Sequence, residues 1–321
     1  MPLGFHDLLG IEPLTAAQIE FLLEQSKPFQ KFNAQPLKKL ATLRGRTVVL
    51  AFFEPSTRTR VSFATAASRL GADAMNLQAE ASSLRKGESM LDTVATLDAM
   101  KPDLFVVRHS SAGAPHMVAD FLEIPVINAG DGWHEHPTQG LLDALTIRDR
   151  KGRLDLNVTI LGDILHSRVA RSNIALLGKF GARITLCGPA MWLPKELEML
   201  APKVRREPNL AHALDDADVV LVLRVQKERM HEPALPLEDY ILRYQLTPAR
   251  LAQARRDAIV LHPGPMNRGL EIDPAVADGP QSCVLEQVTN GLAVRMALLF
   301  LMLGGAAAVD APAILKEAAH G

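Results

Sequence analysis

The chain has 321 residues, 48% hydrophobic and 22% charged, and since a single core rarely grows beyond about 250–300 residues, we expect a globular protein of two domains. The formal net charge of −1 argues against nucleic-acid binding, and two cysteines without a CxxC pair exclude a disulfide framework and a cysteine-based metal site. Because the N-terminal residues lack the charged and then apolar order of a signal peptide, we expect a cytoplasmic protein.

Short apolar runs alternate with helix-length segments along the whole chain. The runs that we expect to form strands are 47–53, 74–77, 103–109, 124–128, 155–162, 182–187, 217–225 and 257–262. Most are dense in Val, Ile and Leu without strict alternation, as in strands that are covered on both faces, which predicts βαβ units and mainly parallel sheets. Eight such strands suit either one TIM barrel or two open sheets of four strands.

A polar, charged stretch from Arg148 to Arg153 interrupts this pattern midway, and we expect the domain boundary there. The apolar run 296–309 is too short to span a bilayer, so we expect no membrane partner. It belongs to a predicted buried helix at about 287–308 that packs back on the first half. The predicted domains are therefore 1–148 plus 287–321, and 149–286.

Polar residues follow the predicted strands repeatedly, at the point where each strand ends. They are Ser56 to Arg60, Arg108-His109 and Asn128 in the first half, and Gly162-Asp163 with Arg168, Arg224 to Gln226 and His262 to Pro265 in the second. In open α/β sheets, ligands bind beyond the carboxyl ends of the strands. The pattern therefore predicts one cleft between two sheets, with walls from both.

The segment from Glu54 to Arg60 follows the first strand and opens a predicted helix, whose apolar positions are Val61, Phe63, Ala67 and Leu70. A helix N-terminus presents unpaired amide groups, and hydroxyls and a guanidinium beside them suit a phosphate. The residues alone also allow an ordinary helix cap with solvated arginines.

His136 and Gln139 flank the start of another predicted helix, where a neutral histidine can polarise a carbonyl group. A purely structural histidine is the alternative. His134 and His136 resemble a metal pair, but no third ligand has suitable spacing, so we expect no metal. The loop that contains Lys86 is either a solvated linker or a mobile loop that reaches an anionic ligand. G-x-G-x-x-G and P-loop motifs are absent from the sequence, so we expect no nucleotide cofactor.

Together these motifs resemble the aspartate/ornithine carbamoyltransferase family, most closely its aspartate-specific catalytic chains. The resemblance extends over nearly the whole chain and rests on Ser56-Thr57-Arg58-Thr59-Arg60, Val107-Arg108-His109, His136-Pro137-Thr138-Gln139, Arg224-Val225-Gln226 and His262-Pro263-Gly264-Pro265. It implies two open, mainly parallel-sheet α/β domains with an interdomain active-site cleft. It also implies transfer of the carbamoyl group of carbamoyl phosphate to L-aspartate, in de novo pyrimidine biosynthesis, without a cofactor or a metal.

The resemblance also implies a role for each domain and for individual residues. Residues 1–148 plus 287–321 would bind carbamoyl phosphate, and residues 149–286 would bind aspartate. The catalytic residues would be Arg58, Thr59, Arg108 and His136. The carbamoyl phosphate site would contain Ser56, Thr57, Arg58, Thr59, Arg108, His136, Gln139, Gly264 and Pro265. The backbone carbonyls of Pro263 and Gly264 would contact the amino group of aspartate and the carbamoyl group. Aspartate would be bound by Lys86, Arg168, Arg224 and Gln226.

Lys86 matches a lysine that family members insert into the neighbouring subunit's site, which implies a homotrimer with shared active sites. Other members often have two lysines there, whereas this chain has Arg85-Lys86, and the role of Arg85 stays open. Gly264 stands where others have Leu or Ala. Arg168 and Arg224 suit the two carboxylates of aspartate better than the cationic ornithine, whose transferases have a His-Cys-Leu-Pro loop. Association with a regulatory chain or a dihydroorotase stays open.

Overall fold

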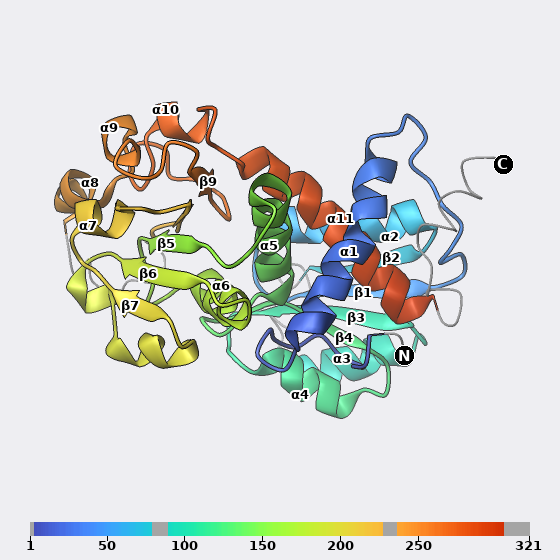
Figure 1. Ribbon diagram of the computed structural model, residues 1–321. Helices are drawn as coiled ribbons and strands as arrows, with labels where there is room; N and C mark the ends of the chain where they lie inside the picture. Colours follow the sequence, from blue (N-terminus) through green and yellow to red (C-terminus); the bar gives the residue numbers. More distant parts are fainter. Residues whose placement is uncertain (1–2, 79–88, 227–235, 305–321) are drawn as a thin grey trace. The chain divides into compact units, whose positions relative to one another are not determined.

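The computed structural model describes residues 3–78, 89–226 and 236–304 (Figure 1). The chain forms two compact units, 1–141 with 289–321 and 142–288. Each unit has its own sheet, and every strand pair in both sheets is parallel. The prediction of two open, parallel-sheet α/β domains is confirmed, and the single TIM barrel is excluded. The predicted cleft between the two domains stays a prediction.

The sheet of the first unit has the strand order β2-β1-β3-β4. Its strands are β1 (Thr47–Phe52), β2 (Asp73–Gln78), β3 (Leu104–His109) and β4 (Val126–Asp131). Because the chain leaves β1 for β2 on one side and returns to β3 on the other, the carboxyl ends of β1 and β3 form the switch point where ligands bind in such sheets. The helices before and between the strands are α1 (Ala16–Asn33), α2 (Thr57–Leu70), α3 (Met90–Asp98) and α4 (Ala114–Phe121).

Helix α2 connects the first two strands and buries one face against the sheet. Its buried residues are Thr59, Phe63, Ala66, Ala67 and Leu70. Val61, an apolar position of the predicted helix, lies outside this face, since it is 53% exposed. A residue two positions before Phe63 lies on the opposite side of an α-helix, because successive residues turn by about 100°. Gly71 ends the helix with a φ of 87°, a conformation that favours glycine.

The sheet of the second unit has the order β7-β6-β5-β8-β9. Its strands are β5 (Asn157–Leu161), β6 (Arg183–Cys187), β7 (Val204–Arg206), β8 (Val219–Val222) and β9 (Ile259–Leu261). The prediction of four strands missed β7. That edge strand has three residues, two of them exposed arginines, so it forms no apolar run. The switch point of this sheet lies between β5 and β8.

The remaining elements of the second unit are mostly short. They are α6 (Arg168–Lys179), η3 (Ala190–Trp192), η4 (Lys195–Leu200), α7 (Leu210–Leu214), α8 (Leu237–Tyr244), α9 (Pro248–Leu251) and α10 (Pro274–Ala277). One core cluster packs β5, β6 and β8 against α7 to α10, and its largest side chains are Trp192, Tyr240 and Tyr244.

Two helices contain the points at which the units divide: α5 (Pro137–Lys151) and α11 (Val284–Leu303). The polar stretch from Arg148 to Lys151 forms the last turn of α5, where basic side chains interact favourably with the helix dipole. Within the part of the chain that the structure describes, α11 is long and apolar enough to cross a membrane. Because 67% of its most apolar window is buried, α11 has the environment of a core helix.

Candidate active site

The turn between β1 and α2 has the features of an anion site. Ser56 occupies the N-cap position, and its hydroxyl makes no capping hydrogen bond to the helix. The first turn of α2 contains no acidic residue. Thr57 and Arg58 are exposed, whereas Thr59 is buried. The amide groups of this helix start, with the positive end of the helix dipole, are therefore oriented to receive an anion.

Arg108 is held beside this turn by the pairing of β3 with β1. Arg108 lies opposite Phe52 in the parallel register, and its carbonyl accepts a hydrogen bond of 2.8 Å from the amide of Phe53. The guanidinium Nη2 lies 2.7 Å from Glu54 Oε1, and Nη1 donates to the carbonyl of Ala129 at 3.0 Å. The side chain is thus anchored at the switch point of the sheet.

His136 and Gln139 lie at the start of α5 in the same unit and are 4% and 8% exposed. The carbonyl of His136 accepts hydrogen bonds from the amides of Gln139 and Gly140, at 2.9 and 3.2 Å. His136 Nδ1 lies 3.5 Å from Thr138 Oγ1. The backbone therefore fixes both predicted site residues at a helix N-terminus.

Arg295 of α11 connects the starts of α2 and α5 and was not predicted from the sequence. Its guanidinium donates to Ser62 Oγ at 2.8 Å and to Thr138 Oγ1 at 3.4 Å. It also lies over the ring of Phe63, 5.1 Å from the ring centroid. Arg295 is 5% exposed, and the signal that could have identified it is a single arginine within the apolar stretch 291–303 of α11.

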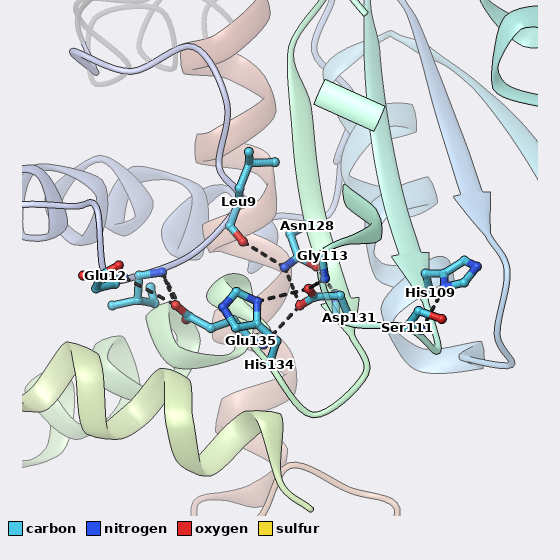
Figure 2. Close-up of polar contacts among 11 residues, drawn as sticks. Leu9, Glu12, His109, Ser111, Gly113, Asn128, Asp131, His134 and Glu135 are labelled. Atoms are coloured by element: carbon cyan, nitrogen blue, oxygen red, sulfur yellow. Dashed lines mark hydrogen bonds and ion pairs between the residues drawn. The ribbon is translucent and has the colours of Figure 1, made fainter. Parts of the chain in front are cut away.

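A buried carboxylate, Asp131, organises the loop between β4 and α5 (Figure 2). It accepts hydrogen bonds from Asn128 Nδ2, Gly113 N and Glu135 N at 2.9, 2.8 and 3.1 Å, and His134 Nδ1 lies 3.1 Å away. Burial alone would raise the pKa of Asp131, but these hydrogen bonds together lower it. Asn128 also donates to the carbonyl of Leu9.

The neighbours of His136 in this loop have structural contacts. Both carboxylate oxygens of Glu135 accept a hydrogen bond of 3.0 Å from the backbone amide of Ile11. Ile11 belongs to the N-terminal segment, which Figure 2 shows beside the loop. His134 points to Asp131 rather than toward a second ligand. Among the described residues, no group of three or more His, Cys, Asp or Glu side chains is arranged to hold a metal ion.

In the second unit, the segments after β5 and β8 are joined by a hydrogen bond. Asp163 follows β5 and accepts the backbone amide of Gln226, which follows β8. His166 Nδ1 also lies 2.8 Å from Asp163 Oδ1. Desolvation raises the pKa of the buried Asp163 carboxyl. Arg168 is the first residue of α6 and is buried, so it lies a few residues beyond this junction.

The loop after β9 contains a cis peptide bond between Gly264 and Pro265. The buried His262 organises it, because His262 Nδ1 accepts the amide of Gly264 at 2.8 Å. The side chain of Asn267 donates to the carbonyl of Val225 at 3.2 Å. The loop is therefore tied to the segment that carries Arg224 and Gln226.

The predicted residues are divided between the two units. The first unit contains Ser56, Thr57, Arg58, Thr59, Arg108, His136 and Gln139. The second unit contains Arg168, Arg224, Gln226, Pro263, Gly264 and Pro265. Lys86 and Arg85 lie outside the described residues.

Comparisons with known proteins agree with the resemblance seen in the sequence. Residues 6–149 match the family model for the carbamoyl-P binding domain of aspartate/ornithine carbamoyltransferases, and residues 154–302 match that for the Asp/Orn binding domain. The chain is 57% identical over 305 residues to the aspartate carbamoyltransferase catalytic subunit of Solibacter usitatus. The matched region covers 95% of this chain and 100% of that one.

Two solved structures have the same fold. Aspartate transcarbamoylase from Trypanosoma cruzi in complex with carbamoyl phosphate and aspartate matches with a TM-score of 0.80 and 31% identity, over 92% of this chain and 96% of that chain. Ornithine carbamoyltransferase from Pyrococcus furiosus matches with a TM-score of 0.82 and 29% identity, over 94% and 97% of the two chains. The family predicted from the sequence is confirmed.

Proposed function

The chain belongs to the aspartate/ornithine carbamoyltransferase family, and we infer from this that it transfers the carbamoyl group of carbamoyl phosphate to the amine of L-aspartate. The products are N-carbamoyl-L-aspartate and phosphate. The observation that carries this inference is the 57% identity, over nearly the whole chain, to a relative named as an aspartate carbamoyltransferase catalytic subunit. We propose that the reaction serves de novo pyrimidine biosynthesis.

Ser56, Thr57, Arg58 and Thr59 bind the phosphate group of carbamoyl phosphate in this proposal. The start of α2 supports it, because the Ser56 hydroxyl does not cap the helix and the first turn has no acidic residue. A phosphate at this position would interact with the helix-start amides and the positive end of the dipole. Arg108 would bridge the phosphate and the carbonyl oxygen. The side-chain carbonyl of Gln139 would accept a hydrogen bond from the carbamoyl nitrogen.

The chemical step joins the aspartate nitrogen to the carbamoyl carbon and then breaks the bond from that carbon to the phosphate oxygen. The amine attacks as the neutral base, and its proton leaves with the phosphate. Arg58, Thr59, Arg108 and His136 donate hydrogen bonds to the oxyanion that forms, and one such donor is typically worth about 3–4 kcal/mol. Contact between the two bound substrates supplies a further contribution, roughly 7–11 kcal/mol in well-aligned sites.

Arg168, Arg224 and Gln226 bind aspartate in this proposal. The backbone carbonyls of Pro263 and Gly264 accept hydrogen bonds from its amine and from the carbamoyl group. Two arginines match the two carboxylates of aspartate, whereas ornithine carries a cationic side chain that they would repel. The hydrogen bond from the Asn267 side chain to the carbonyl of Val225 supports a joint role for the loop after β9 and the end of β8. This bond holds the two segments against each other.

We propose residues 1–148 plus 287–321 as the carbamoyl-phosphate-binding domain and residues 149–286 as the aspartate-binding domain. The two family models, which match 6–149 and 154–302, support that division of roles. We further propose a homotrimer in which Lys86 acts in the site of a neighbouring subunit.

A comparison of acceptors tests the proposed function. The purified chain is incubated with carbamoyl phosphate and either L-aspartate or L-ornithine, and the ureido product and phosphate are measured. We expect turnover with aspartate and none above background with ornithine. Turnover with ornithine alone would contradict the proposal, and phosphate binding without turnover would indicate a subunit that is not catalytic.

A further inference from the structure

A chain of buried polar side chains in the second unit ends at the loop after β9. Asn173 Nδ2 of α6 donates to Asp143 Oδ2 at 2.8 Å, and Gln287 Nε2 of α11 donates to Asp143 Oδ1 at 2.7 Å. Gln287 Oε1 in turn accepts the backbone amide of His262 at 2.9 Å. All four residues are at most 3% exposed, so water does not compete for these hydrogen bonds.

The carboxylate fixes the orientation of the glutamine. Both Asp143 oxygens accept hydrogen bonds, one from Asn173 and one from Gln287, so the Gln287 side chain presents its NH₂ group to Asp143. Its carbonyl oxygen is then directed to the amide of His262, the first residue after β9. Loss of that acceptor would remove this hydrogen bond from a buried backbone amide, which is costly.

Beyond His262 the hydrogen bonds continue through the loop. His262 Nδ1 accepts the amide of Gly264, so Nε2 carries the proton of the neutral ring and faces Glu271 Oε1 at 3.2 Å. Glu271 accepts the amide and the side chain of Asn267, at 2.5 and 3.0 Å. Asn267 then reaches the carbonyl of Val225, between Arg224 and Gln226. Each link is satisfied at both ends, which specifies one loop conformation.

We propose that Gln287 and Asp143 are positioning residues for aspartate: they hold the segment 262–267 and, through it, the end of β8 in the conformation that binds the second substrate. This inference rests on the proposed function. Neither residue is among those proposed to contact substrate. Their chemistry fits a positioning role because buried polar groups are costly unless every hydrogen bond is made, and an apolar pair would pack here at lower cost.

Exchanging the two side-chain types tests the proposal. Gln287→Glu places a carboxylate against Asp143, and Asp143→Asn allows Gln287 to rotate. The double variant Asp143→Asn with Gln287→Glu restores the pattern, because the amide introduced at position 143 donates to the carboxylate introduced at position 287, which still accepts from the amide of His262. We expect each single variant to raise the KM for aspartate about tenfold, the usual effect of one buried hydrogen bond, and the double variant to recover most of it.

Two controls separate positioning from general stability. The Kd for inorganic phosphate, a ligand of the first unit in this proposal, should stay within about twofold of the wild-type value in every variant. The residues of the hydrogen-bonded chain all lie in the second unit, so their substitution should not affect the phosphate site. Gln281→Ala removes a hydrogen bond of 2.8 Å to the carbonyl of Ala258, at the opposite end of β9. We expect this variant to change the thermal unfolding temperature but not the KM for aspartate.

The outcomes distinguish this inference from the proposed function. A wild-type chain without turnover on aspartate would overturn the proposed function itself. If the wild-type chain is active, an unchanged KM in folded Gln287→Glu would overturn the positioning role. If the single variants do not fold, the double variant decides. A double variant with the wild-type unfolding temperature but a KM for aspartate still raised tenfold would contradict the proposal. Recovery of both the unfolding temperature and the KM for aspartate would support it.

Discussion

Glu54 and Arg108 form an ion pair of 2.7 Å at the carboxyl ends of the adjacent strands β1 and β3. The two side chains are 13% and 12% exposed, so the pair is largely shielded from water. It holds the guanidinium beside the turn between β1 and α2. A site for a phosphate and a carbonyl oxygen needs such a fixed cation, because the donor must be in place before the charge develops.

Replacing Glu54 with alanine should therefore impair catalysis. Arg108 would keep its bond to the carbonyl of Ala129 but lose the carboxylate that orients it. We expect kcat/KM for carbamoyl phosphate to fall at least about tenfold, since small misplacements of catalytic groups are costly. Steady-state kinetics checks this.

Arg46→Ala is the matched control, because Arg46 pairs with Asp103 at 2.5 Å at the opposite edge of the same sheet. Arg46 is 51% exposed, and exposed ion pairs contribute little, so its kinetics should equal those of the wild type. Increased activity of Glu54→Ala would show instead that Glu54 competes with substrate for Arg108.

Arg58→Ala should reduce turnover by at least two to three orders of magnitude without unfolding the chain, in line with the loss of an oxyanion donor. The side chain is exposed at the start of α2, so few packing contacts are lost. Stopped-time assays of product, with circular dichroism for folding, measure the two effects. Arg69→Ala, in the last turn of the same helix and bonded to Asn33, should retain turnover. Near-normal turnover of Arg58→Ala would remove Arg58 from the mechanism.

The strand ends were predictable from the sequence for a physical reason. Parallel strands bring their carboxyl ends to one edge of a sheet, so polar residues after successive apolar runs must lie close together. This rule explains why Arg108 lies beside the turn before Ser56. It also explains why the segment after β8 donates a hydrogen bond to Asp163, which follows β5. Buried strands such as β1 were easy to recognise, because β1 is apolar in every residue after Thr47.

The contacts that orient the site residues were not predictable in the same way. Arg295 meets Ser62, and Gln287 meets Asp143, across more than a hundred residues of sequence, and no local pattern indicates such pairs. Arg295 is the one charged residue of the apolar stretch 291–303, whereas Gln287 lies beside other polar residues and leaves no such signal. Strand β7 was missed for a different reason, since three residues with two arginines have no apolar periodicity.

Mixing two inactive variants tests whether active sites are shared. Lys86→Ala and Arg58→Ala chains, each nearly inactive alone, should regain activity after subunit exchange, because some sites would then combine an intact Arg58 from one chain with Lys86 from another. In randomly mixed trimers the recovered activity should be a substantial fraction of the wild-type value. No recovery, after exchange has been verified by mass, would exclude a role for Lys86 in a neighbouring site.

Asp131→Asn should destabilise the first unit in a pH-dependent manner. Both oxygens of Asp131 accept hydrogen bonds, from Asn128 and Glu135 on one side and from Gly113 on the other. An asparagine turns its NH₂ group toward one of these donors, and a lost buried partner costs roughly 1–3 kcal/mol of unfolding free energy at neutral pH. Chemical denaturation of both proteins measures the difference.

The pH dependence follows from the pKa of Asp131. Burial raises it, but the hydrogen bonds from His134, Asn128, Gly113 and Glu135 outweigh burial, so the folded-state pKa lies below the ordinary value. A lowered pKa contributes stability above the unfolded-state value, about 3.9, and this contribution disappears as the pH falls through the lower folded-state pKa. The difference between wild type and Asp131→Asn should therefore be constant near neutrality and shrink below about pH 4.

Asp278→Asn provides the comparison for this titration. Asp278 pairs with Arg268 at 2.6 Å on the surface, and this pair also lowers the pKa of Asp278. Because the pair is exposed, water and salt screen it, and the substitution should leave the unfolding free energy nearly unchanged at every pH. An Asp131→Asn variant that behaves like Asp278→Asn would mean that the loop before His136 does not depend on the Asp131 carboxylate.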